Sequence, residues 1–281
     1  MKRKLLVLVP IVIIAIIAAV IYFKDTDKII VGVDNNPPYT FLNQPVSVSL
    51  DKNGVATTAA AKDGAYAGFD IDVIEAAAKI AGLKIEYHEI VFGKMLEQIE
   101  QGKQRAKIYA KSYYAPSAEI DVAIGGVSVT DERKKLVDFT TPYAKGGACI
   151  VTLQGSGIAN ANDLSGKTVG VELSTTMVKQ AAAVIGANLK GYHNQQDMYI
   201  DLYDGVIDAI VMDKMSAEYC VKERKMSKIK IVNLLSNEEF AMVTRKTDNQ
   251  LTDKLNKALL EMEKSGELKK LYDKWFTKLL P

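Results

Sequence analysis

Polar side chains that could hold a small anion gather near the middle of this 281-residue chain. Ser128 and Thr130 stand at alternate positions, and Arg133 follows three residues after Thr130. The apolar run 122–124 precedes them and predicts a buried strand that ends at Gly125-Gly126. Thr130 is then the expected N-cap of a helix that begins beside Arg133.

This corner of the chain suits a carboxylate ligand. Arg133 offers a bidentate pair of donors, and the hydroxyl groups and free N–H groups at a helix start add more donors. Spacing alone also fits an alternative, in which Arg133 is a surface arginine of a capped helix.

The same segment resembles the signature of the polar amino-acid-binding proteins that serve ABC importers, the family 3 solute-binding proteins. Their pattern is D-A-x-x-x-G-x-[ST]-x-T-x-x-R-x-x-x-x-x-F-[ST]-x-x-Y. The positions of this chain that fall on it are Asp121, Ala123, Gly126, Ser128, Thr130, Arg133, Phe139, Thr140 and Tyr143. The resemblance implies that Gly126, Ser128 and Arg133 bind the ligand, with Arg133 on its α-carboxylate.

Two further segments of the first half match this family. The β-branched run Lys28–Val33 predicts a first strand, and the turn after it carries prolines and Tyr39, as in the family. That turn lacks the extra aromatic residue that usually forms one wall of the side-chain pocket. Residues 68–72 match the motif G-F-D-x-D and predict a helix to about Ala81. The resemblance implies that Tyr39 and Phe69 bind the ligand, although Phe69 equally fits core packing at a helix start.

The second half supplies the opposite wall of the expected site. A strand expected at 168–173 leads to three hydroxyl residues at a helix start, Ser174, Thr175 and Thr176. The positive end of a helix attracts a carboxylate, whereas the plainer interpretation is an ordinary N-cap run. Residues 201–213 resemble the family's L-x-x-G-x-x-D-A-x-x-x-D. The resemblance implies that Asp213 accepts the ligand's α-ammonium group, while Asp208 is expected to be structural.

Two acidic residues are expected to select the ligand's side chain. The resemblance places Asp34, at the end of the first strand, and Glu172 in the side-chain pocket. A buried carboxylate without a cation is costly, because the charged form loses its hydration. This favours lysine, arginine or ornithine as the ligand. In the alternative, Glu172 faces solvent or pairs with a lysine such as Lys179, and the ligand is neutral and polar, such as glutamine.

The resemblance implies an α/β, two-lobed periplasmic-binding-protein-like (type II) fold with two hinge crossovers. Lobe one is expected at 27–143 plus 241–281, and lobe two at 144–240. The ligand is expected between the lobes, at the carboxyl ends of strands. Closure of the lobes is then what a membrane permease reads.

Three segments extend beyond the family pattern. Three basic residues precede nineteen apolar residues, 5–23, so residues 1–26 are expected to be a signal peptide or an uncleaved N-terminal hydrophobic helix that anchors the chain. The insert 43–65 alternates apolar and polar residues around Asn53-Gly54, which predicts a hairpin. Within the second insert, 104–119, residues 105–114 are expected to be extended nearby in lobe one. The inserts are either solvated loops or a small added sheet that docks a partner or covers the cleft.

Composition excludes several other classes of function. Four of the 36 basic residues lie in the first 24, which leaves 32 against 34 acidic residues and no basic surplus for nucleic acid. Two isolated cysteines, Cys149 and Cys220, are expected to be buried apolar residues, with a disulfide as the alternative. The chain has only two histidines and no P-loop or Gly-x-Ser-x-Gly motif, so no metal, cofactor or catalytic residue is expected.

The leading function is extracytoplasmic capture of an amino acid by a monomer that delivers it to an ABC permease. One alternative is a membrane-held receptor domain that reports its ligand to a separate signalling chain. The other is an enzyme similar to the cyclohexadienyl dehydratases, which share the fold that the resemblance implies.

Overall fold

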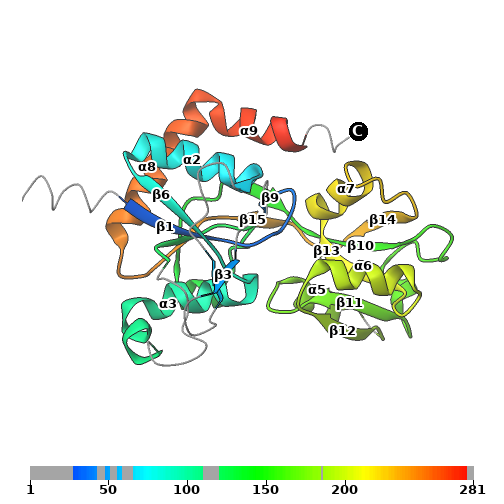
Figure 1. Cartoon of the computed structure of the whole chain (residues 1–281). Helices are drawn as coiled ribbons and strands as arrows, with labels where there is room; N and C mark the ends of the chain where they lie inside the picture. The colour runs from blue at the N-terminus through cyan, green and yellow to red at the C-terminus, as the bar shows by residue number, and fades with distance from the viewer. Residues whose placement is uncertain are drawn as a thin grey trace, which may run out of the picture.

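The computed structural model describes residues 28–42, 48–50, 56–58, 66–109, 120–184 and 186–276. They form two α/β bodies side by side, joined by two strands that cross between them (Figure 1). Each body contains a five-stranded sheet. The expected segment 1–26 lies outside the described residues. Among the described residues, no helix is long and apolar enough to cross a membrane.

The first sheet has the strand order β6-β1-β7-β16-β8. Its strands are β1 (Lys28–Val33), β6 (Lys84–Glu89), β7 (Val122–Ala123), β8 (Asp138–Phe139) and β16 (Val243–Thr244). β1 runs parallel to β6 and β7, whereas β16 is antiparallel to β7 and β8. The chain therefore returns to this sheet after it has built the second body.

Helices α2 (Phe69–Ala81), α8 (Asn249–Ser265) and α9 (Glu267–Phe276) pack together on the first sheet (Figure 1). Helix α2 begins and ends as the sequence predicts. It ends at Ala81 because Gly82 adopts the left-handed conformation with φ 68° and caps the helix. Helix α3 (Phe92–Tyr109) covers a second cluster of buried apolar residues that includes Met95 and Ile99. The short α4 (Asp131–Lys134) carries Arg133.

The second sheet has the strand order β12-β11-β13-β10-β14. Its strands are β10 (Ala148–Leu153), β11 (Thr168–Glu172), β12 (Asn188–Tyr192), β13 (Ala209–Asp213) and β14 (Ile229–Leu234). The helices of this body are the 3-10 turn η1 (Ala161–Leu164), α5 (Met177–Ala182), α6 (Gln195–Tyr203) and α7 (Lys214–Lys222). Because β11 and β13 are parallel neighbours, Glu172 and Asp213 end their strands at the same edge of the sheet.

The two bodies are joined by the antiparallel pair β9 (Ala144–Gly146) and β15 (Glu238–Phe240). Glycines allow the close approach there. A Cβ atom on Gly147 would lie 2.0 Å from the backbone oxygen of Ser236, so a larger residue would collide with the returning chain. The chain therefore crosses between the two bodies twice, as the resemblance implies. The lobe bounds 27–143 plus 241–281 and 144–240 stay a prediction, and the two bodies are called lobe one and lobe two below.

The structure confirms the prediction for the first insert and contradicts part of the prediction for the second. β3 (Val48–Leu50) and β4 (Ala56–Thr58) pair antiparallel with Leu50 opposite Ala56, which confirms a hairpin on either side of Asn53-Gly54. The expectation of an extended segment from Arg105 is wrong up to Tyr109, because α3 continues that far. Gln, Arg, Ala and Lys at 104–107 are strong helix formers, and they extend the helix. The remainder of that insert lies outside the described residues.

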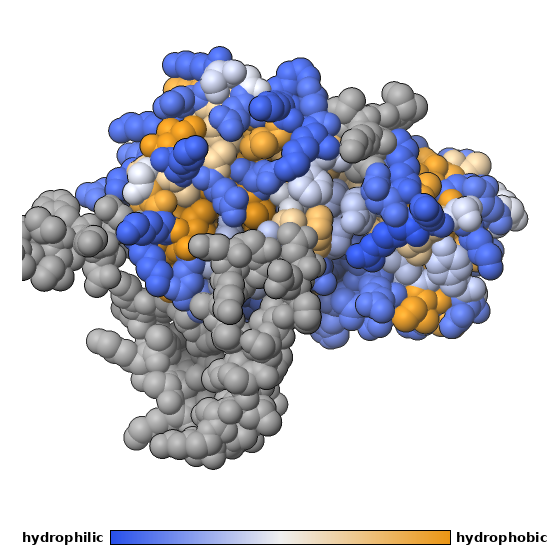
Figure 2. Space-filling view, turned by 45° about the horizontal axis from the view of Figure 1, so that its top comes forward, coloured by the Kyte–Doolittle hydropathy of each residue, from blue (hydrophilic) through white to orange (hydrophobic). Residues whose placement is uncertain are grey.

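The two cysteines are buried, and the face of the molecule shown in Figure 2 is mainly polar. Cys149 and Cys220 are buried free thiols in the core of lobe two, as expected of small apolar residues. The face shown in Figure 2 is mainly hydrophilic, with small separate hydrophobic patches.

The remaining short strands, β2 (Phe41–Leu42) and β5 (Tyr66–Ala67), pair beside α2.

Candidate ligand-binding site between the lobes

A cavity lies where the two lobes meet the crossover strands. Its lining comes from four segments of lobe one, from the strand ends and helix starts of lobe two, and from β15. The lining residues are Asn36, Tyr39, Phe92, Gly125, Gly126, Ser128, Arg133, Glu172, Thr175, Thr176, Met177, Gln195, Val211, Met212, Asp213 and Phe240. Eight of the eleven expected ligand-binding residues are among them.

Arg133 supplies a buried cation at one end of the cavity. Thr130 caps α4 by accepting the Arg133 N–H at 3.1 Å, as the sequence predicts. The guanidinium group donates to the backbone oxygen of Ser128 at 2.9 Å and of Ser174 at 3.3 Å, and lies 5.8 Å from the Phe92 ring centroid. Burial lowers the pKa of Arg133, and the charge of Glu238 opposes that shift.

None of the ion pairs formed among the described residues includes Arg133. The residue is only 9% exposed, and its hydrogen-bond acceptors are neutral carbonyl groups. A buried guanidinium group in that position is stabilised by an anion. The arrangement can therefore bind a carboxylate.

Hydroxyl groups from both lobes lie beside this cation. Ser128 Oγ of lobe one and Thr176 Oγ1 of lobe two are 3.4 Å apart, and both donate to the Glu238 carboxylate. Thr175 has a different role, because its hydroxyl donates to the backbone oxygen of Glu172 at 2.7 Å within the turn before α5. Gly126 lines the cavity at φ 62°, and its N–H donates to Asp70 at 2.8 Å.

Asp213 supplies a buried carboxylate at the end of β13. Its Oδ1 accepts from the Tyr39 hydroxyl at 2.8 Å, across the two lobes, and from the Ser216 N–H at 3.0 Å. Burial raises the pKa of Asp213, while these hydrogen bonds and that from Gly147 oppose the shift. The group can accept a further donor such as an ammonium group, which would favour its charged form.

Glu172 is a second buried carboxylate in the cavity. Burial raises its pKa to about 7, the hydrogen bond from Gln195 lowers it, and the charge of Asp34 raises it. Gln195 Nε2 donates to Glu172 at 3.3 Å and to Asn36 Oδ1 at 2.9 Å. No ion pair among the described residues includes Glu172 or Asp34, so neither carboxylate has a cationic partner there.

Three expected ligand-binding residues do not line the cavity. Phe69 is fully buried in the core of lobe one, where its ring meets Tyr143 and Phe276, so the core-packing alternative holds. Asp34 accepts the N–H of Phe92 at 3.1 Å at the start of α3, and acts on Glu172 through its charge. Ser174 contributes its backbone oxygen to Arg133 rather than its side chain to the cavity.

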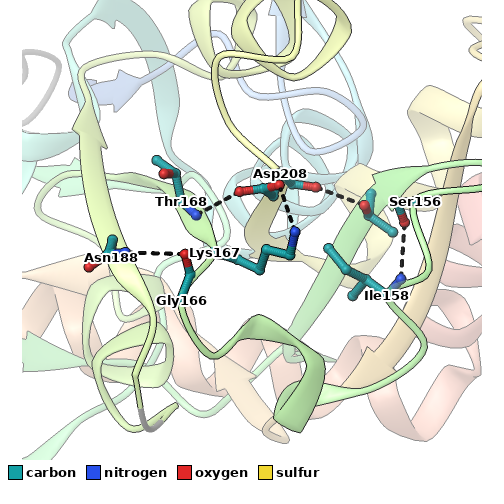
Figure 3. Close-up of polar contacts among 8 residues, drawn as sticks. Ser156, Ile158, Gly166, Lys167, Thr168, Asn188 and Asp208 are labelled. Atoms are coloured by element: carbon teal, nitrogen blue, oxygen red, sulfur yellow. Dashed lines mark hydrogen bonds and ion pairs between the residues drawn. The ribbon is translucent and has the colours of Figure 1, made fainter.

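The expectation that Asp208 is structural fits its contacts. Figure 3 shows its carboxylate between Thr168 and Lys167. Asp208 directly precedes β13, whereas Asp213 ends that strand. Asp208 accepts the Thr168 N–H at 2.8 Å and the Lys167 ammonium group at 3.3 Å. It thereby fixes the start of β11 against β13.

Sequence reasoning missed Asn36, Phe92, Gln195 and Glu238. Phe92 and Gln195 each follow a strand end and open a helix, a position at which α/β proteins place ligand contacts, so that placement could have found them. Glu238 lies in the crossover strand, and neither its residue type nor its spacing marks it out.

Comparison with known proteins places the chain in a family. The model of the bacterial extracellular solute-binding proteins, family 3, matches residues 114–278. The chain belongs to this family. A second family model, the L-glutamate- and glycine-binding site of ligated ion channels, matches residues 28–155.

Relatives of this family 3 protein include the arginine-binding extracellular protein ArtP of Bacillus subtilis, which is 32% identical over 75% of the chain and 78% of that relative. The L-cystine-binding protein TcyJ of Escherichia coli is 29% identical over 90% of the chain and 84% of that relative. Among solved structures, an ancestral arginine-binding protein bound to arginine matches with a TM-score of 0.71 and 34% identity over 89% of the chain and 98% of that protein.

Proposed function

We propose that this family 3 protein captures a basic amino acid outside the cytoplasm and delivers it to an ABC permease. Arg133, with Ser128 and Thr176, is the seat of the ligand's α-carboxylate, and Asp213 accepts its α-ammonium group. The two groups lie on opposite lobes, so one amino acid bridges them and favours the closed arrangement. The names of ArtP and of the ancestral protein bound to arginine support this class of ligand.

The observation that carries the choice of a basic ligand is the buried negative corner at Glu172. Its pKa near 7 means that the charged form lacks stabilisation in this structure, and Asp34 adds a second negative charge nearby. A guanidinium or ammonium group on the ligand would supply the missing cation and lower that pKa. Phe92, which already lies against the Arg133 guanidinium group, offers an aromatic surface in the same cavity.

Glutamine is the alternative ligand, and one observation favours it. The Gln195 amide already donates to Glu172, which shows that a neutral amide can satisfy this carboxylate in part. A glutamine side chain could donate in the same manner. Export through residues 1–26, either as an uncleaved anchor or as a cleaved signal peptide, and a monomeric state remain part of the proposal.

A thermal-shift screen tests the ligand class. We expect arginine, lysine or ornithine to raise the melting temperature, because a ligand that binds only the folded chain stabilises it by mass action. Glutamine, histidine and cystine serve as comparison ligands. A shift with glutamine or cystine and none with the basic amino acids would contradict a basic ligand. No shift with any amino acid would contradict amino-acid capture.

A further inference from the structure

The Glu238 carboxylate lies where both lobes meet the return crossover. Its Oε2 accepts from the Thr176 hydroxyl at 2.8 Å and from the Ser128 hydroxyl, and its Oε1 accepts from Ser236 Oγ at 3.0 Å. One carboxylate oxygen thus joins a side chain of lobe one to a side chain of lobe two. Glu238 also acts on Arg133, whose pKa its charge raises against the effect of burial.

These contacts are the ones that the α-carboxylate of an amino acid would need. A hydroxyl group has one proton to donate. Because Ser128 and Thr176 both donate to Glu238, neither can donate to a second carboxylate at the same time. A second carboxylate beside Glu238 would also meet like-charge repulsion.

The space around these groups is small. The cavity measures about 40 Å³, against roughly 300 Å³ for the smallest usual ligand pockets. An amino acid therefore needs the lobes to part and the Glu238 side chain to leave the hydroxyl groups. The backbone can stay in place, because Glu238 pairs with Gly146 across the crossover.

We propose that Glu238 is an internal competitor for the α-carboxylate seat, so that an amino acid binds only by displacing its side chain. This inference rests on the proposed function. The Glu238-occupied arrangement holds the lobes together without accepting ligand, and the apparent affinity is reduced by the fraction of molecules in it. Glu238 is then a residue that sets affinity from within the hinge.

The first test compares Glu238→Gln with Glu239→Gln by calorimetric titration of arginine. Both substitutions remove one negative charge from β15, but the Glu239 side chain is exposed and lies outside the cavity lining. A neutral amide is a weaker acceptor than a carboxylate, so Glu238→Gln should bind arginine about tenfold more tightly than wild type. Glu239→Gln should stay within about twofold of wild type. An unchanged or weaker affinity in Glu238→Gln overturns the proposal.

Argininamide gives a readout that a merely structural role for Glu238 would not produce. It keeps the basic side chain and the α-ammonium group but carries a neutral amide in place of the carboxylate, so it has no charge to compete with Glu238. Easier displacement of the side chain at 238 should help both ligands. Relief from like-charge repulsion should help arginine alone, so the gain from Glu238→Gln should be clearly larger for arginine than for argininamide. An equal gain for argininamide would overturn competition for the carboxylate seat.

Small-angle scattering of the amino-acid-free proteins tests whether Glu238 holds the lobes together, even if arginine is not the ligand. Bound small molecules are first removed by partial unfolding and dialysis. Glu238→Gln should then show a larger radius of gyration than wild type and Glu239→Gln, because the link between Ser128 and Thr176 is weakened. Equal radii in the three proteins overturn the role of Glu238. Failure of every basic amino acid to bind wild type would instead refute the proposed function.

Discussion

The Tyr39 hydroxyl donates to Asp213 Oδ1 at 2.8 Å, although the two residues are 174 positions apart and lie on opposite lobes. Both side chains line the cavity, and Tyr39 is only 1% exposed. The bond lowers the pKa of Asp213, which burial otherwise raises. Tyr39 thus favours the charged form of the carboxylate that we propose for the ligand's α-ammonium group.

Tyr39→Phe should therefore weaken amino-acid binding. Without the hydroxyl group, the Asp213 carboxylate loses a hydrogen bond that favours its charged form, so arginine affinity should fall by about tenfold. Tyr192→Phe is the matched control, since it removes a tyrosine–aspartate hydrogen bond to Asp201 outside the cavity. Calorimetry on both variants checks this, and an equal loss in both would contradict a specific role for Tyr39.

Glu172 makes the stability of the protein depend on pH. Burial raises its pKa from 4.5 to about 7, so the folded chain holds this proton between those pH values while the unfolded chain releases it. The contribution of Glu172 to the free energy of unfolding therefore falls as pH rises from about 4.5 to 7. Without amino acid, Glu172→Gln should melt at a higher temperature than wild type at pH 8, with a smaller difference at pH 5.

Arginine should reduce this difference in melting temperature at pH 8. Its guanidinium group would stabilise the charged Glu172, so wild type should gain more in melting temperature than Glu172→Gln. Asp70, whose pKa burial also raises to about 7, is present in both proteins and cancels in the comparison. Equal gains in the two proteins would show that Glu172 does not contact the cation of the ligand.

Thr130→Ala should destabilise the segment that carries Arg133. Thr130 accepts the Arg133 N–H at 3.1 Å as the N-cap of α4, and loss of such a cap costs about 1 kcal/mol. Thr130→Ser keeps the hydroxyl group and serves as the control. Urea unfolding measures the difference between the two variants, and equal free energies of unfolding would show that this cap does not stabilise the helix.

Local patterns were enough to predict the elements that carry the site. The strand Lys28–Val33, the helix 69–81 and the Thr130 cap depend on residues close in sequence, and the structure confirms all three. The hairpin of β3 and β4 follows in the same way from the residues that flank Asn53-Gly54.

What the sequence could not predict depends on tertiary packing. Phe69 opens α2 in the expected place, but whether its ring faces the core or the ligand is decided by α9 and Tyr143, which arrive later in the chain. Gln195 reaches Asn36 across 159 positions, and no local pattern pairs them. Glu238 enters the site only because the return crossover brings β15 beside Ser128.

The most direct measurement of the central claim is calorimetric titration of arginine into wild type, Arg133→Ala and Arg133→Lys. Removal of one partner from a buried charge pair costs about 2–5 kcal/mol, so Arg133→Ala should bind about 30- to 4,000-fold more weakly. Arg133→Lys should also bind poorly, because it loses the bidentate fork. The exposed neighbour Lys134, replaced by alanine, should leave the affinity unchanged. An Arg133→Ala affinity within about threefold of wild type would contradict a carboxylate seat at Arg133.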